Sequence, residues 1–187
     1  MNQTFLFFGW WTKYYIIHFV PKSRQEHLLS GRITHIIAAP HHQDAGTNHW
    51  CFYLATSPTT SIQLDCQPSH SVPSTVLPGG SKAFIIISEL DYSLAPDVEG
   101  KYVLDITPDR GLTVNDLLTL LIGNGRHRYE FDSRGVGCRF WVTEQLELFY
   151  ASRVLTGRAQ IEDVKAAIKK LWPEATPLEL DRGAYYE

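Results

Sequence analysis

Cys138 is the residue whose place in the sequence most clearly favours chemistry. It follows Gly135-Val136-Gly137 and opens a segment whose apolar residues recur at helical spacing. Backbone N–H groups converge at the first turn of a helix, and together with the helix dipole they favour a thiolate. The same groups can hold an oxyanion that forms during acyl transfer. Cys138 is therefore a candidate nucleophile, with a buried, unreactive cysteine as the alternative.

A thiol nucleophile needs a base and usually a group that orients the base. His49, near the start of a strand expected over residues 49–56, is the candidate base. In the next expected strand, 61–66, the alternation of side chains places Gln63 and Asp65 on one face. Asp65 would stabilise an imidazolium, whereas Gln63 could only orient the ring. The sequence leaves both open as the third member of the site.

Several residues close in sequence to His49 and Cys138 are candidates for contacts with a substrate. They are Asn48, Thr47, Trp50, Tyr53 and Trp141. Asn48 or Thr47 could also complete the oxyanion hole. The aromatic members of this set favour a small apolar or aromatic acyl group.

The histidine-rich stretch before the second strand offers a rival arrangement, a metal site. The candidate ligands are His41, His42, Asp44 and His49, with Asp65 or His70 as a further one. None of the standard ligand spacings, such as H-E-x-x-H, is present. Loop histidines are more often exposed or hydrogen-bonded, so we expect no metal and no other cofactor.

The order of the expected elements is a run of strands followed by helix, strand and helix. The expected strands are 5–20, 32–39, 49–56, 61–66, 82–90, 101–106 and 129–131. The expected helices are 113–122, 138–154 and 161–171, with a loop over 67–81 and an irregular tail over 172–187. This order predicts an α+β fold in which an antiparallel sheet packs against helices.

The composition is that of an ordinary globular chain. It has 187 residues, 44% hydrophobic and 20% charged, and its net charge of -3 gives no footprint for nucleic acid. Its three cysteines lack regular spacing, which fits a reducing, cytoplasmic compartment. The aromatic stretch from Phe5 to Trp11 has no basic n-region, and Lys13 and His18 interrupt the apolar run, so neither a signal peptide nor a membrane span is expected. It is expected to pack on the core or to form a homodimer surface.

The order of these motifs resembles the circularly permuted papain-like superfamily, and within it the lecithin–retinol acyltransferase-like branch. That branch carries an R-H-W-A-x-Y-type strand and an N-C-E-H-F-type helix start. The corresponding residues here are Asn48 to Tyr53 and Gly137 to Trp141, and the likeness covers about residues 32–155 of one domain. The aromatic extension 1–31 and the C-terminal helix and tail, 156–187, lie outside it. Two departures stand out: Gly-Cys-Arg-Phe replaces Asn-Cys-Glu-His, and Gln63 or Asp65 stands where the family has a second histidine.

The resemblance implies a thiol-dependent hydrolase or acyl or amide transferase that acts on an ester, thioester or amide through Cys138 and His49. The chain also resembles small uncharacterised fungal proteins, some encoded near genes of specialised metabolism, which keeps small molecules among the expected substrates. Two alternatives remain open. One is a non-covalent cyclase or small-molecule binding protein that uses the same cleft, and the other is a catalytically dead, papain-like interaction module.

Overall fold

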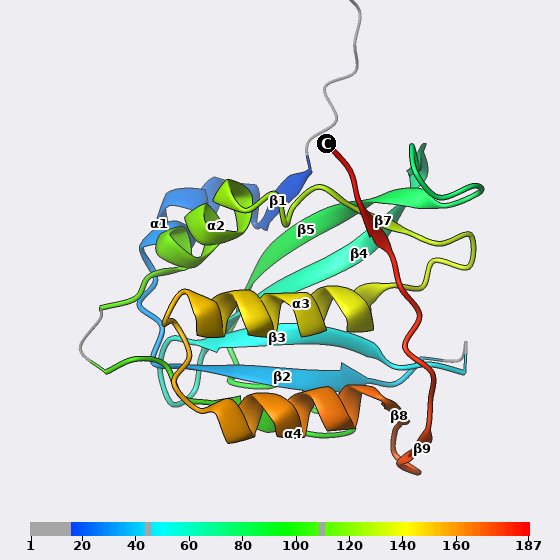
Figure 1. The fold of residues 1–187 in the computed structure, drawn as a ribbon. Helices are drawn as coiled ribbons and strands as arrows, with labels where there is room; N and C mark the ends of the chain where they lie inside the picture. The colour runs from blue at the N-terminus through cyan, green and yellow to red at the C-terminus, as the bar shows by residue number, and fades with distance from the viewer. Residues whose placement is uncertain (1–15, 44–45, 109–110) are drawn as a thin grey trace, which may run out of the picture.

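The computed structural model describes residues 16–43, 46–108 and 111–187 of the chain, and its main feature is one large sheet (Figure 1). The strands of this sheet are β1 (Ile17–Val20), β2 (His35–His41), β3 (His49–Ala55), β4 (Ser61–Pro73), β5 (Ser81–Leu90), β6 (Tyr102–Leu104), β7 (Tyr129–Phe131) and β10 (Ala184–Tyr185). The helices are η1 (Lys22–Arg24), α1 (Gln25–Ser30), α2 (Val114–Gly123), α3 (Cys138–Ala151) and α4 (Arg158–Ile168). A separate pair is formed by β8 (Lys170–Leu171) and β9 (Thr176–Pro177).

The sheet has the strand order β10-β7-β5-β4-β3-β2-β6, and neighbours along this path are antiparallel. β1 stands off the path and pairs with β5 in parallel. The predicted α+β class with a large antiparallel sheet is thus confirmed, with one parallel pair added. In the described part of the chain, no helix is both long and apolar enough to cross a membrane.

Two strands at the centre of the sheet separate toward one end, and this separation makes room for the candidate site. β3 pairs with β4 from Phe52 opposite Leu64 to Ala55 opposite Ser61. Beyond these pairs β4 continues beside β5, where Pro68 lies opposite Ala83. A proline is tolerated there because it needs no ladder hydrogen bond on the open side of the strand. The loop predicted over 67–81 was therefore wrong for residues 67–73, which belong to β4, whereas residues 74–80 do form the connection to β5.

One face of the sheet is covered by helices. Figure 1 shows α3 lying along β3, and the two elements are in contact. Phe52 on β3 packs against Trp141 and Phe149 on α3, with ring centroids 6.3 and 5.7 Å apart. α4 packs against α3 and β6. This apolar contact fixes the height of α3 over the sheet, and with it the position of its N-terminus.

Three other local predictions can be compared with the structure. The helix expected over 113–122 is confirmed as α2. It begins with a capping box, in which the side chains of Thr113 and Asp116 each accept a hydrogen bond from the other's backbone N–H. The irregular tail was wrong in part, since β10 adds an edge strand beside β7. The aromatic stretch from Phe5 to Trp11 lies outside the described residues, as does the homodimer surface proposed for it.

Candidate functional site

His49 and Asp65 form a short polar contact at the open end of the β3–β4 pair. His49 Nε2 lies 2.6 Å from Asp65 Oδ1. Asp65 Oδ2 accepts a second hydrogen bond, from Gln67 Nε2, also at 2.6 Å. Asp65 is only 3% exposed, so both of its oxygens are satisfied by protein groups rather than by bulk water. The carboxylate is held in one orientation by a partner on each side.

Charge attraction between these side chains outweighs the effect of burial on both. Burial alone would lower the pKa of His49, but the Asp65 carboxylate and the Cys138 thiol raise it well above its ordinary value. Burial alone would raise the pKa of Asp65, but His49 and the Gln67 amide lower it. The pair therefore favours an imidazolium beside an ionised carboxylate.

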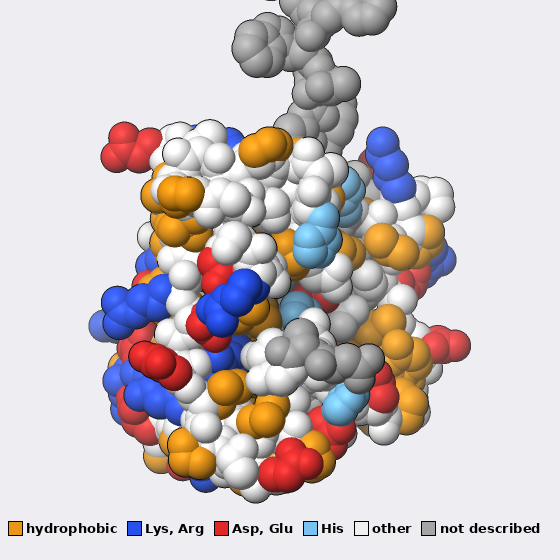
Figure 2. Space-filling model, turned by 90° about the vertical axis from the view of Figure 1, so that its right-hand side faces the viewer, with side chains coloured by type: hydrophobic (Ala, Val, Ile, Leu, Met, Phe, Trp, Pro, Cys, Tyr) orange, Lys and Arg blue, Asp and Glu red, His pale blue; other side chains and the backbone are white. Residues whose placement is uncertain are grey.

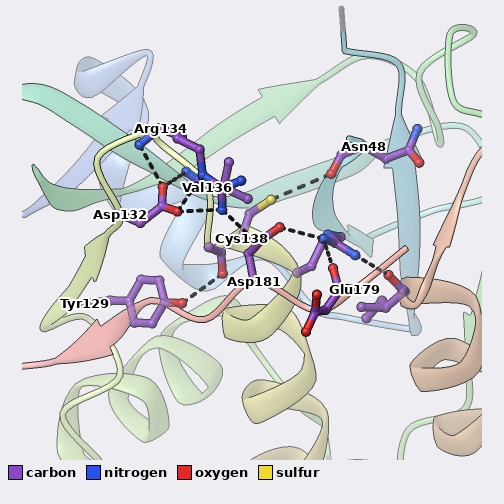
Figure 3. A network of polar contacts seen from close by, with 11 residues as sticks. Asn48, Tyr129, Asp132, Arg134, Val136, Cys138, Glu179 and Asp181 are labelled. Atoms are coloured by element: carbon purple, nitrogen blue, oxygen red, sulfur yellow. Dashed lines mark hydrogen bonds and ion pairs between the residues drawn. The ribbon is translucent and has the colours of Figure 1, made fainter. Parts of the chain in front are cut away.

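Cys138 is the first residue of α3, and a tight turn delivers it there. Its N-cap residue, Gly137, has φ of +157°, and a Cβ at this position would lie 3.2 Å from Phe131 and from the Tyr129 hydroxyl. The Tyr129 hydroxyl donates a hydrogen bond to the Gly137 carbonyl at 2.8 Å. Asp132 accepts from the Val136 backbone N–H at 2.9 Å (Figure 3). These contacts explain the need for glycine before the cysteine and fix the entry into the helix.

The Cys138 thiol is 6% exposed and lies 3.9 Å from the Asn48 carbonyl oxygen. Burial would raise its pKa, but the charge of His49, a hydrogen-bonding interaction with that ring and the Trp50 backbone N–H lower it below the ordinary thiol value. Cys138 and His49 therefore shift each other's pKa in the directions that favour a thiolate–imidazolium pair. The structure brings together Cys138, His49 and Asp65, which come from α3, β3 and β4.

The C-terminal segment is tied to the first turn of α3 by Arg139. This side chain is fully buried and donates to the Ile168 and Glu179 carbonyls and to the Asp181 carboxylate (Figure 3). Asp181 also accepts from Arg134 at 2.6 Å, and Arg134 in turn pairs with Asp132 in the turn before Cys138. An alternating series of charges thus joins the turn, the helix start and the tail.

His49 and Cys138 line a cleft of about 460 Å³. Its lining residues are Gln43, Thr47, His49, Gln67, Pro68, His70, Phe131, Arg134, Gly135, Val136 and Cys138. Figure 2 looks onto this end of the molecule and shows histidine side chains around a hollow in the surface. The cleft therefore gives small molecules a route to His49 and Cys138.

Three predicted site residues have other partners. Gln63 donates to Cys51 Sγ at 3.3 Å, so Asp65 rather than Gln63 meets His49. The side chain of Asn48 binds the backbone N–H and carbonyl of Trp172, which removes it from the oxyanion hole. The Tyr53 hydroxyl lies 2.9 Å from His41 Nε2, and Tyr53 is not among the residues that line the cleft.

The two tryptophans predicted to contact a substrate lie in the core instead. Trp50 is fully buried and packs near Tyr102, with ring centroids 5.8 Å apart. Trp141 is also fully buried and donates its indole N–H to the Arg126 carbonyl. Thr47 does line the cleft, and within the described structure its buried hydroxyl has no hydrogen-bond partner. Of the candidates for substrate contact, Thr47 is the one that reaches the cleft.

The proposed histidine ligands do not gather around one point in the described part of the chain. His41 contacts Tyr53 and lies 3.8 Å from Asp97, whereas His49 contacts Asp65. No group of three or more His, Cys, Asp or Glu side chains arranged to hold a metal ion occurs among the described residues. Asp44, another proposed ligand, lies outside them.

Gln67 is the site residue that the sequence prediction missed. It lines the cleft and holds Asp65, although it was expected in a loop. Its position two residues after Asp65 is the signal that could have found it. Side chains two residues apart in a strand point to the same face, so Gln63, Asp65 and Gln67 share one face.

Comparison with known families shows which family the chain belongs to, but that family has no known activity. The family described as "Domain of unknown function (DUF7770)" matches residues 34–186, and the chain belongs to this family. Comparisons with curated proteins and with solved structures each found no match.

Proposed function

We propose that the protein is a thiol-dependent hydrolase or acyl transferase that acts on an ester, thioester or amide. Cys138 would be the nucleophile, His49 the base and Asp65 the residue that orients the base. The observations that carry this proposal are the 2.6 Å contact between His49 and Asp65 and the position of His49 and Cys138 in the lining of one cleft, with the Cys138 thiol at a helix N-terminus and its pKa lowered by His49. A cysteine that only packs in the core has no need of a charged partner of this kind.

In the proposed reaction, the Cys138 thiolate attacks the carbonyl carbon and forms a C–S bond. The imidazolium of His49 gives its proton to the leaving group as the bond between that group and the carbonyl carbon breaks. Neutral His49 then removes a proton from water, or from an acceptor amine or alcohol, which attacks the thioester. The thiolate leaves and the starting ion pair is restored. Asp65 keeps Nε2 occupied, so that the other ring nitrogen is the one available for proton transfer.

The first turn of α3 supplies donors for the oxyanion that forms during the attack. Gly137 has no side chain with which to cap the helix, and no side-chain cap is present. The backbone N–H of Cys138 is therefore a candidate oxyanion donor. The Thr47 hydroxyl, which lines the same cleft, is a candidate for a second donor.

The order of His49 on β3, Asp65 on β4 and Cys138 at the start of α3 supports the permuted papain-like fold as part of the proposal. The cleft lining does not support a preference for aromatic acyl groups, because that expectation depended largely on Trp50 and Trp141. The lining mixes Phe131, Val136 and Pro68 with amide, guanidinium and imidazole groups.

The experiment is to trap the acyl-enzyme. Purified protein is mixed with p-nitrophenyl acetate and quenched in acid, and its intact mass is measured. We expect one acetyl group per chain, mapped by peptide digestion to Cys138, and none in Cys138→Ala. Cys66→Ala removes a core thiol outside the cleft lining and is the matched control, which should still be acetylated. Acetylation of Cys138→Ala to the same extent would end the proposal.

A further inference from the structure

The position of Gln67 points to a second feature of the cleft, a built-in acceptor for a substrate N–H group. Gln67 follows Asp65 by two residues on β4, so both side chains lie on the same face of the strand. Its Nε2 lies 2.6 Å from Asp65 Oδ2. The side chain therefore lies between a member of the candidate catalytic site and the open cleft.

The chemistry of Asp65 decides which end of the Gln67 amide faces it. An ionised carboxylate can only accept hydrogen bonds, so the NH₂ group of Gln67 must be the end that meets Asp65. Asp65 is ionised under ordinary conditions, because His49 and Gln67 lower its pKa despite burial. The amide oxygen, Oε1, is consequently directed away from Asp65. Gln67 is exposed and lines the cleft, so this oxygen is available there.

The two charged groups of the lining cannot supply an acceptor for a substrate N–H group. Arg134 presents a guanidinium, which can only donate, and protonated His49 is also a donor. Among the described lining residues, Gln43 and Gln67 are the side chains with an amide oxygen. Gln67 alone of these two is held in place by a charged partner in the described structure, which makes its oxygen the better-oriented acceptor.

We propose that Gln67 Oε1 accepts a hydrogen bond from an N–H group next to the scissile carbonyl, and that the natural substrates are therefore amides rather than esters. This inference rests on the proposed function, because it assumes that the substrate carbonyl lies at Cys138. Gln67 is then a specificity-determining residue whose two ends serve different partners: Nε2 holds Asp65 and Oε1 contacts the substrate. A site that hydrogen-bonds an N–H group discriminates against an analogue with oxygen there, since the acceptor is left unpaired.

The experiment compares two acylating probes of nearly equal size, 4-nitrophenyl N-propylcarbamate and 4-nitrophenyl propyl carbonate. In both, the Cys138 thiolate attacks the carbonyl carbon and 4-nitrophenolate leaves. The atom next to that carbonyl is an N–H in the carbamate and an oxygen in the carbonate. The rate constant of each with Cys138 is measured by intact mass and divided by its rate constant with N-acetylcysteine, which removes intrinsic reactivity. We expect the carbamate-to-carbonate ratio of the wild-type protein to be about five, which is the effect of a single net hydrogen bond. In Gln67→Met this ratio should return to about one.

Two variants serve as controls. Gln63→Met removes the same amide from the same strand face, but its partner is Cys51, so the ratio should stay at the wild-type value. Gln43→Met tests the other amide of the cleft and should also leave the ratio unchanged. Loss of Asp65 orientation in Gln67→Met would slow both probes alike and cancel in the ratio.

A wild-type ratio of one, or a ratio unaffected by Gln67→Met, would overturn the assignment of Gln67 while a reactive Cys138 leaves the proposed function standing. Loss of the preference in Gln43→Met instead would assign the acceptor to Gln43 and also overturn the inference. A Cys138 that reacts with neither probe would count against the proposed function itself.

Discussion

The Asp65 carboxylate lies 2.6 Å from His49 Nε2 while almost wholly shielded from solvent, and this relationship organises the candidate site. Burial of either group alone would disfavour its charged form. As a pair they favour their charged forms at the open end of the β3–β4 pair, where Gln67 donates a hydrogen bond to the second carboxylate oxygen. The start of α3 brings Cys138 to the same place.

Asp65→Asn should lower the pKa of His49. The carboxylate raises this pKa and the amide cannot, so the imidazolium should lose its proton at a lower pH in the variant. The measurement is an NMR titration of the His49 ring in both proteins. Asp97→Asn is the matched control, because Asp97 lies beside His41 instead and should leave the His49 titration close to that of the wild type. An unchanged His49 pKa in Asp65→Asn would contradict the assigned pairing.

Gly137→Ala should destabilise the fold and slow alkylation of Cys138. Its φ of +157° is strained for alanine, and the added Cβ would press on Phe131 and Tyr129. Holding alanine in this strained conformation should lower the free energy of unfolding by about 1–3 kcal/mol, which urea denaturation measures. Gly123→Ala at the end of α2 meets open space and should leave stability unchanged or slightly raised. Equal effects at both glycines would mean that the turn before Cys138 is not specially constrained.

Arg139→Met should detach the C-terminal segment from the start of α3. It leaves the Asp181 carboxylate and two backbone carbonyls without this donor, and breaking such a buried arrangement costs about 3 kcal/mol or more. Hydrogen exchange should show faster exchange in β10 and around Cys138. Arg158→Met breaks an exposed arrangement with two carboxylates, Glu147 and Glu162, and should change neither stability nor exchange there. Protection of β10 that survives Arg139→Met would rule out this role for Arg139.

The elements that could be predicted from the sequence are those with a strong local pattern. The apolar residues at helical spacing after Cys138 identified α3, and the helix expected over 113–122 and the strand expected over 82–90 correspond to α2 and β5. The strand predicted over 61–66 ended too early, because a proline such as Pro68 normally stops a strand. Only the tertiary structure shows that one edge of β4 is open there. β10 has two residues, and its existence depends on pairing with β7, which no local pattern encodes.

The same distinction applies to the site. The alternation of strand residues placed Asp65 on a useful face, but it could not choose between Asp65 and Gln63, because that depends on where β3 and β4 separate. Trp50 was assigned to the cleft because it adjoins His49 in sequence. Neighbouring strand residues point to opposite faces, and this rule places Trp50 in the core. Its burial beneath the helices is the observed result.

The reactivity of Cys138 tests the central claim most directly. Protein is treated with iodoacetamide at neutral pH, and the labelling rates of Cys138, Cys51 and Cys66 are followed by mass spectrometry. Burial raises the pKa of Cys51 and Cys66, whereas His49 lowers that of Cys138. We therefore expect Cys138 to react at least about a hundredfold faster than the other two. In His49→Gln this advantage should be lost, because burial then raises the Cys138 pKa unopposed by the imidazolium. Labelling of Cys138 no faster than Cys51 and Cys66, or unaffected by His49→Gln, would contradict the thiolate–imidazolium pair and the function built on it.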